Sequence, residues 1–303
     1  MKDKILKSGY GIGNIVFIAA LIIALPLRIY QYTAGIIEPQ TGFFATNGLS
    51  VYALFAVLVA GVAAIILFGF IKRKTLDYSL DKVKRPGMGA LSGLFAASLI
   101  IDAVSCLDAM GSIDIGLRVS ETSPERTSYY IILLQMIFAL ISALYFVILC
   151  VGLLSGKTTA EEFRIVSLAP VFWNIFRMIS RFMRTISYIR VSELLFEMIM
   201  LVFMILFFMT FAQCNSRVSD KDCKWKLGAY GLPAALFALI CFVPRFILSL
   251  TGKADVIYSY SVIEYADCAA AFFIIGTVLT RVCTAKPEKD GKNDAEATTA
   301  TEE

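Results

Sequence analysis

Long runs of apolar residues, separated by short polar segments, recur along nearly the whole chain. A helix needs about 20 mainly apolar residues to cross the roughly 30 Å hydrocarbon layer of a bilayer. Because the bilayer offers no water to unpaired backbone groups, each such run is expected to be an α-helix. The predicted fold class is therefore all-α, a polytopic membrane bundle of about eight transmembrane helices. The eight segments are Gly11 to Leu27, Val51 to Ile71, Met88 to Met110, Tyr129 to Leu154, Val166 to Met183, Val191 to Phe211, Leu227 to Leu248 and Tyr258 to Leu279.

The two ends of the chain differ from these segments. The first seven residues are basic and precede an apolar run, as in a secretory signal, but no small-x-small cleavage site follows Pro26. The first segment is therefore interpreted as an uncleaved helix. The last residues, Thr284 to Glu303, include no large apolar side chain and predict disorder. The predicted organisation is a single transmembrane domain, residues 1–283, followed by a disordered cytoplasmic tail, residues 284–303.

The distribution of lysine and arginine predicts the orientation of the chain, because cytoplasmic loops carry an excess of both. With eight spans and a cytoplasmic N-terminus, the inner segments contain 19 basic residues and the outer loops contain 4. If the fifth segment, Val166 to Met183, lay along the surface as an amphipathic helix, the counts would become 16 and 10. We therefore expect a multi-pass protein of a cell membrane with both termini in the cytoplasm.

The amino-acid composition agrees with a multi-pass membrane protein and excludes several classes of function. Hydrophobic residues make up 58% of the 303 residues and charged residues 17%, whereas soluble domains have about 45–50% and about 25%. The chain has no histidine, which excludes His-ligated zinc, Ser-His-Asp and Cys-His catalysis and histidine proton relays. Phosphate-binding loops, dinucleotide fingerprints and nucleophile elbows are also missing from the sequence. We therefore expect neither a cofactor, nor a metal, nor a nucleic-acid partner.

Basic residues gather in the second cytoplasmic loop, from Lys72 to Arg85. This loop contains six positive and two negative residues. Such a cluster beside a membrane helix fixes topology and attracts anionic headgroups. The expected partners are therefore membrane lipids, with anionic lipid at this loop.

Eleven charged residues fall inside or close to the apolar segments. Each costs several kcal/mol in the bilayer unless it is paired, hydrated or turned toward the bundle interior. At a rise of about 1.5 Å per residue, Asp102, Glu197 and Glu264 each lie about 9 Å below the outer surface. Arg181 reaches a comparable depth, so the charges converge on the outer half of the membrane. The eleven residues are Arg28, Arg177, Arg181, Arg184, Arg245, Asp102, Asp108, Glu193, Glu197, Glu264 and Asp267.

Helical spacing places many of these charges on shared faces, because residues three and four apart are neighbours. The third, fifth, sixth and eighth segments are expected to present charges to a shared, outward-facing vestibule, with Arg28 and Arg245 at its mouth. Asp108 follows Asp102 by six residues, about 240° around the helix, and is expected to face away. The polar stripe of the fifth segment consists of Trp173, Asn174, Arg177, Arg181, Arg184 and Tyr188.

The arginine stripe supports two hypotheses. Guanidinium groups bind carboxylate or phosphate through paired hydrogen bonds, so the protein would bind or transport a small anionic or zwitterionic solute. In the alternative, a structural or assembly protein, the positive and negative groups form a salt-bridge network that fixes the order of the helices. The candidate ligand-binding residues are Arg177, Arg181 and Arg184, then Asp102, Glu197 and Glu264 as counter-ions or proton-coupling groups, and finally Asp267, Arg28 and Arg245.

Two other roles have less support from the sequence. A voltage sensor repeats arginine over a longer run and belongs to a channel with a selectivity filter, and the sequence has neither feature. An intramembrane enzyme would need a carboxylate dyad that shares a proton. The candidate pairs are Asp102 with Asp108 and Glu264 with Asp267. Asp102 and Asp108 point in different directions and cannot pair on a single helix.

Overall fold

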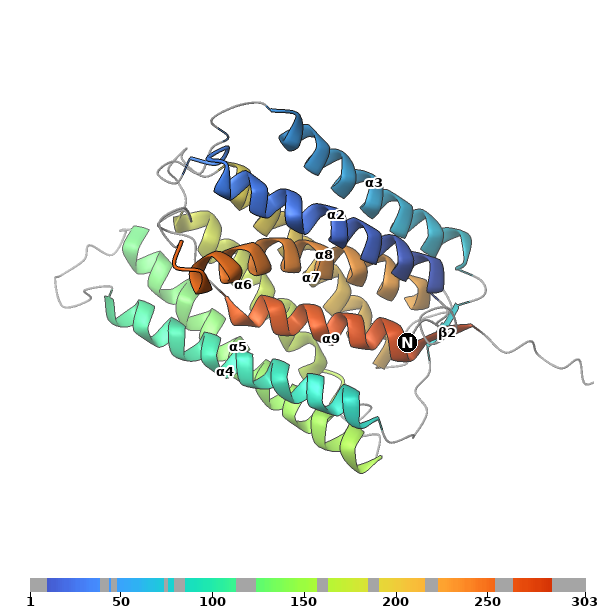
Figure 1. The fold of residues 1–303 in the computed structure, drawn as a ribbon. Helices are drawn as coiled ribbons and strands as arrows, with labels where there is room; N and C mark the ends of the chain where they lie inside the picture. The colour runs from blue at the N-terminus through green and yellow to red at the C-terminus, as the bar shows by residue number, and fades with distance from the viewer. Residues whose placement is uncertain are drawn as a thin grey trace, which may run out of the picture.

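The computed structural model of the chain is a bundle of long, nearly aligned helices (Figure 1). It describes residues 10–38, 44, 48–73, 76–78, 85–112, 124–156, 163–184, 191–215, 223–253 and 264–284. Within these ranges each of the eight predicted segments contains an α-helix. The helices are α2 (Gly11–Thr33), α3 (Leu49–Ile71), α4 (Pro86–Ser112), α5 (Pro124–Ser155), α6 (Ala169–Arg184), α7 (Val191–Asn215), α8 (Cys223–Leu250) and α9 (Tyr265–Arg281).

Six of the described helices are long and apolar enough to cross a membrane, namely α2, α3, α4, α5, α7 and α8. The other two are shorter, since α6 has 16 residues and α9 has 17. At about 1.5 Å per residue they extend about 24 to 26 Å, less than the roughly 30 Å hydrocarbon layer. A short 3-10 turn, η1 (Val166–Leu168), precedes α6. The structure therefore supports a multi-pass membrane protein, with six helices that meet the length criterion.

The outward faces of the long helices are apolar. On α3, Val59, Leu67 and Ile71 are all exposed, and soluble proteins rarely expose large continuous apolar surface. Only 28% of the span in α3 is buried inside the protein, compared with 78% of the span in α8. Accordingly, α3 lies at one edge of the bundle and α8 lies deep within it (Figure 1).

Six helices close into a ring through their packing contacts. Helix α4 packs on α5, α5 on α6, α6 on α7, α7 on α8, α8 on α9, and α9 packs back on α4. Helices α2 and α3 pack on each other and against α8. Helices α4 and α9, which are far apart in the sequence, thereby become neighbours.

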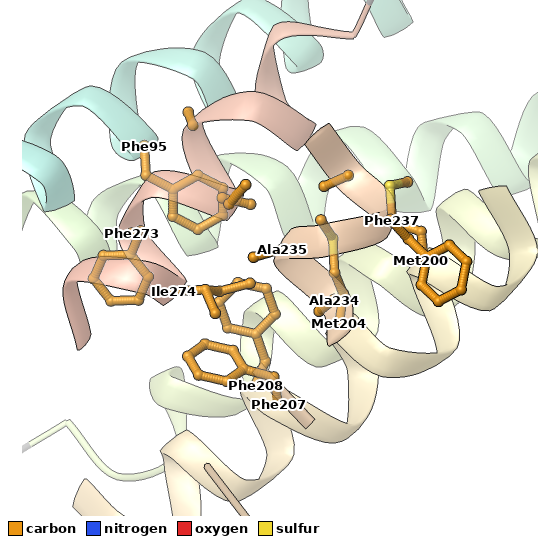
Figure 2. Packing of buried hydrophobic residues seen from close by; sticks show 14 of the residues in the cluster. Phe95, Met200, Met204, Phe207, Phe208, Ala234, Ala235, Phe237, Phe273 and Ile274 are labelled. Carbon is orange, nitrogen blue, oxygen red and sulfur yellow. The ribbon is translucent and has the colours of Figure 1, made fainter. Parts of the chain in front are cut away.

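Phenylalanine side chains fill the middle of the ring. Phe95 of α4 stacks on Phe208 of α7 and on Phe273 of α9, with ring centroids 5.7 and 5.8 Å apart. Phe146 of α5 meets Phe95 edge-on at 4.6 Å. Figure 2 shows this cluster beside α8, which contributes small side chains such as Ala235. A closely packed aromatic layer therefore occupies the ring between its two ends.

The start and the end of the described chain lie at the same end of the bundle. The Tyr10 hydroxyl donates a hydrogen bond of 2.8 Å to the Ile65 carbonyl oxygen near the end of α3. Two short strands that the sequence did not predict, β1 (Leu76–Tyr78) after α3 and β2 (Val282–Thr284) after α9, pair antiparallel. That this end faces the cytoplasm stays a prediction.

Several sequence predictions concern residues outside the described ranges. The predicted tail lies there from residue 285 onward, as does most of the basic loop between Lys72 and Arg85. The side chains of Arg184 and Glu193 are likewise not described. These expectations therefore stay predictions.

Close packing makes Gly231 of α8 sensitive to substitution. A methyl group at this position would lie 2.8 Å from Phe207 Cδ2 and 2.9 Å from Ile274 Cγ2, so a neighbouring side chain must shift. We expect Gly231→Ala to lower the free energy of unfolding by about 1–3 kcal/mol. The measurement is unfolding of the purified protein in one fixed detergent.

Gly87 of α4 provides the matched control, because nothing lies within 4 Å of an added methyl group there. Gly87→Ala is expected to be neutral or to stabilise by up to about 1 kcal/mol, since alanine is the better helix former. Equal losses in the two variants would show that the ring is not closely packed at Gly231.

Candidate ligand-binding site

Buried arginines and carboxylates connect α6, α7 and α9 at the end of the ring opposite the strands. Arg177 pairs through Nη2 with Glu264, the residue before α9, and with Asp267 Oδ1 at 2.6 Å. Arg181, one turn later on α6, pairs with Glu264 at 2.5 Å and with Glu197 of α7 at 2.7 Å. Spacings of four residues on α6 and three at α9 put each pair of side chains on one helix face. Two turns of α6 therefore interlock with the start of α9.

Glu197 extends this network to α8. Its Oε2 atom accepts a hydrogen bond from Arg181, while its Oε1 atom lies 2.7 Å from Arg245 Nη1. The Arg245 and Glu197 side chains are 5% and 17% exposed. A single carboxylate thus joins three helices, and its two cations offset the cost of burying its charge.

A cavity of about 400 Å³ adjoins the network between α4, α5, α6 and the start of α9. Its ionisable lining residues are Asp102 and Asp108 of α4, Arg177 and Arg181 of α6, and Glu264. The volume lies within the range of about 300–1,000 Å³ that small-molecule sites occupy. The lining also includes uncharged polar side chains and apolar ones. The uncharged polar residues are Ser98, Ser105, Gln135, Ser180 and Tyr265.

Asp102 is held in the cavity wall by neutral donors. Its Oδ2 atom accepts a hydrogen bond of 2.8 Å from Trp173 Nε1 and a longer one of 3.4 Å from Gln135 Nε2. The Arg177 guanidinium carbon lies 4.7 Å from the centroid of the Trp173 ring. The buried indole is therefore shared, with its N–H edge toward the carboxylate and its face toward the guanidinium group.

Arg177 is only 1% exposed, yet two of its N–H groups, at Nε and Nη1, have no hydrogen-bond partner among the described residues. The Asn174 side-chain oxygen, nearly one turn earlier on α6, is also buried without a hydrogen-bond partner among the described residues. Each buried polar group without a partner costs about 1–3 kcal/mol, and native proteins contain few of them. Arg177 therefore lies beside the cavity with buried donors that the described residues do not satisfy.

The structure sorts the predicted site residues into two groups. Asp102, Arg177, Arg181 and Glu264 line the cavity together. The other paired residues, Glu197, Asp267 and Arg245, belong to the network that supports it.

Two predicted positions differ from the expected vestibule. Arg28 does not line the cavity: its guanidinium carbon lies 4.9 Å from the Tyr32 ring and 5.1 Å from the Phe196 ring. The sequence predicts how deep Arg28 lies along α2. It does not predict that α2 packs outside the ring, which keeps Arg28 away from the cavity. Asp108, in contrast, does line the cavity, because the opening follows α4 from Ser98 to Ala109 and so spans more than one helix face.

The sequence analysis missed the contributions of Trp173 and Gln135 to the site. Trp173 was placed on the polar stripe of α6, but its bond to Asp102 depends on the contact between α4 and α6. The sequence could have indicated a role for Gln135, since it is the single amide or charged residue between Tyr129 and Leu154. A lone glutamine in an apolar span needs a polar partner inside the bundle.

Comparison of the chain with models of protein families, with curated proteins and with solved structures finds no match. A fold alone does not determine a function. The function is therefore inferred from the chemistry of the cavity and of the network behind it.

The position of Glu197 predicts a large effect on stability. Glu197→Gln keeps the side-chain volume but removes the charge that Arg181 and Arg245 share. Breaking a buried pair in this way costs about 3–5 kcal/mol, and we expect a loss of this size in the unfolding free energy. Thermal or denaturant unfolding in detergent measures this loss.

Asp108→Asn, at an exposed carboxylate, is the control and should change the unfolding free energy by less than about 0.5 kcal/mol. Equal losses in the two variants would contradict the role of the network.

Proposed function

We propose that the protein binds a small solute with an anionic group, as a transporter or a sensor, in the cavity between α4, α5, α6 and α9. The observation that carries this proposal is Arg177, which lines the cavity and keeps two buried N–H groups without a partner among the described residues. A guanidinium group is positively charged and donates hydrogen bonds to carboxylate or phosphate oxygens. An anionic group in the cavity would be attracted by this charge, and it would accept hydrogen bonds from Nε or Nη1 after a shift of the Arg177 side chain.

In this proposal the cavity opens toward the outside of a cell membrane. Lysine and arginine counts of 19 against 4 support a cytoplasmic position for the opposite end, where β1 and β2 pair. The aromatic layer around Phe95 would then separate the bound solute from the cytoplasm. Transport would require rearrangement of that layer, whereas sensing would not.

A second candidate function, a structural or assembly role, is favoured by the ion pairs themselves. Arg181 contacts both Glu197 and Glu264 closely, as expected for charges that lock helices together. A purely structural network, however, does not require an adjoining cavity or donors without partners. The two functions differ in whether a small molecule binds beside Arg177.

Arg177→Lys tests the proposal, because lysine keeps the positive charge for Glu264 and Asp267 but lacks the additional N–H donors of the guanidinium group, Nε and Nη1. The probes are carboxylates of two to six carbons and the corresponding ω-amino carboxylates, tested on the full chain in nanodiscs by calorimetry. We expect at least one probe to bind to the wild type and to bind about tenfold or more weakly to Arg177→Lys. Bound probe should also protect Cys106, a thiol of the cavity lining, from methanethiosulfonate labelling.

Arg28→Lys is the matched control, since Arg28 is also a buried arginine that lies over aromatic rings but is not part of the cavity lining. This variant should bind the same probe as tightly as the wild type. Equal binding by Arg177→Lys, or the failure of every probe to bind and protect Cys106, would leave the structural role as the better explanation.

A further inference from the structure

The ionisable groups around the cavity are unequal in sign. Two arginines face three carboxylates across it, and Glu264 is already engaged by both Arg177 and Arg181. The negative groups left to meet a ligand are therefore Asp102 and Asp108, both on α4. A solute with only negative charge would approach these carboxylates and be repelled by them.

The α4 wall offers acceptors rather than donors. The Ser98 hydroxyl donates to the Phe95 carbonyl oxygen at 2.8 Å, and the Ser105 hydroxyl donates to the Ile101 carbonyl oxygen at 3.0 Å. Their protons are thus bound to the backbone of their own helix, as serine commonly does within helices. The hydroxyl oxygens keep lone pairs that can accept a further hydrogen bond.

Asp102 adds a positioned charge to this wall. Both of its hydrogen bonds from Trp173 and Gln135 end on Oδ2, and Oδ1 accepts none from the residues that the structure describes. The indole of Trp173 is completely buried, so the carboxylate is anchored on one oxygen by a rigid group. The other oxygen remains available as a charged acceptor.

The α6 wall has the opposite character because Arg177 contributes only donors. The α6 side of the cavity therefore carries the cations, Arg177 and Arg181, and the α4 side carries the carboxylates Asp102 and Asp108. The Trp173 indole connects them, with Arg177 over its face and Asp102 at its edge. Such an arrangement fits a ligand with two ends of opposite charge.

We infer that the solute is a zwitterion with a primary ammonium group, bound by its carboxylate at Arg177 and by its ammonium group at Asp102. This inference rests on the proposed function and assigns the ligand class to the same cavity. The ammonium group carries three N–H donors, which match the Asp102 carboxylate and the serine oxygens of α4. A quaternary ammonium group has no such donor and is bound by cages of aromatic rings.

The test compares matched ligands on the full chain in nanodiscs by calorimetry. The probes are ω-amino carboxylates of two to six carbons, the same carboxylates without the amino group, and the same molecules with a trimethylated nitrogen. In the wild type, we expect one amino carboxylate to bind about tenfold or more tightly than either of its analogues. This comparison needs no variant and so does not depend on the folding of a mutant.

Asp102→Asn then locates the ammonium site, because asparagine can still accept the Trp173 hydrogen bond. We expect this variant to lose the preference for the amino group and to bind the plain carboxylate more tightly than the wild type does, because a repelling charge has been removed. Asp102→Glu, which retains the charge, should retain part of the preference. Glu38→Gln, at an exposed carboxylate just after α2, should behave like the wild type.

The outcomes separate this inference from the proposed function. Plain or trimethylated carboxylates that bind as tightly as the amino carboxylate overturn the zwitterion assignment, but leave an anion site at Arg177. A preference that survives Asp102→Asn overturns the assignment of the ammonium site. If no probe binds, or if the bound probe is insensitive to Arg177→Lys, the proposed function is overturned as well.

Discussion

The cost of placing charge inside a membrane is the constraint on which this structure depends. Arg177 and Arg181 cannot face lipid without a cost of several kcal/mol each, and their partners come from the starts of α7 and α9. Pairing thus determines which helices must be neighbours at this end of the ring.

The two ends of the ring are held together in different ways. Aromatic side chains such as Phe95, Phe208 and Phe273 pack the middle by contact area and shape, which specifies position only within limits, since apolar side chains can repack. Charged pairs such as Arg181 with Glu197 depend on distance and direction. The cavity lies between the aromatic layer and the charged pairs. Its polar wall residues are therefore held by interactions that depend on distance and direction.

Hydropathy was sufficient to predict where the helices occur, because a bilayer allows only helices that satisfy their own backbone groups. Depth arithmetic was sufficient to gather Arg181, Glu197 and Glu264 at one level. It could not predict that Asp102 bonds to Trp173, nor that Arg28 lies apart from the cavity, because both depend on helix order around the ring. Spacing gives the height and face of a side chain on its own helix, whereas partner choice depends on neighbours from other parts of the chain.

The pairing of β1 with β2 has a mechanical consequence for the seam between α4 and α9. The strands join the segment before α4 to the segment after α9, and Arg85 adds a hydrogen bond to the Thr280 carbonyl oxygen. The two helices are thus fastened to each other at one end, while the cavity lies between their other ends. Because this link holds α4 and α9 together at the strand end, a separation of the two helices would begin at their other ends and would widen the cavity.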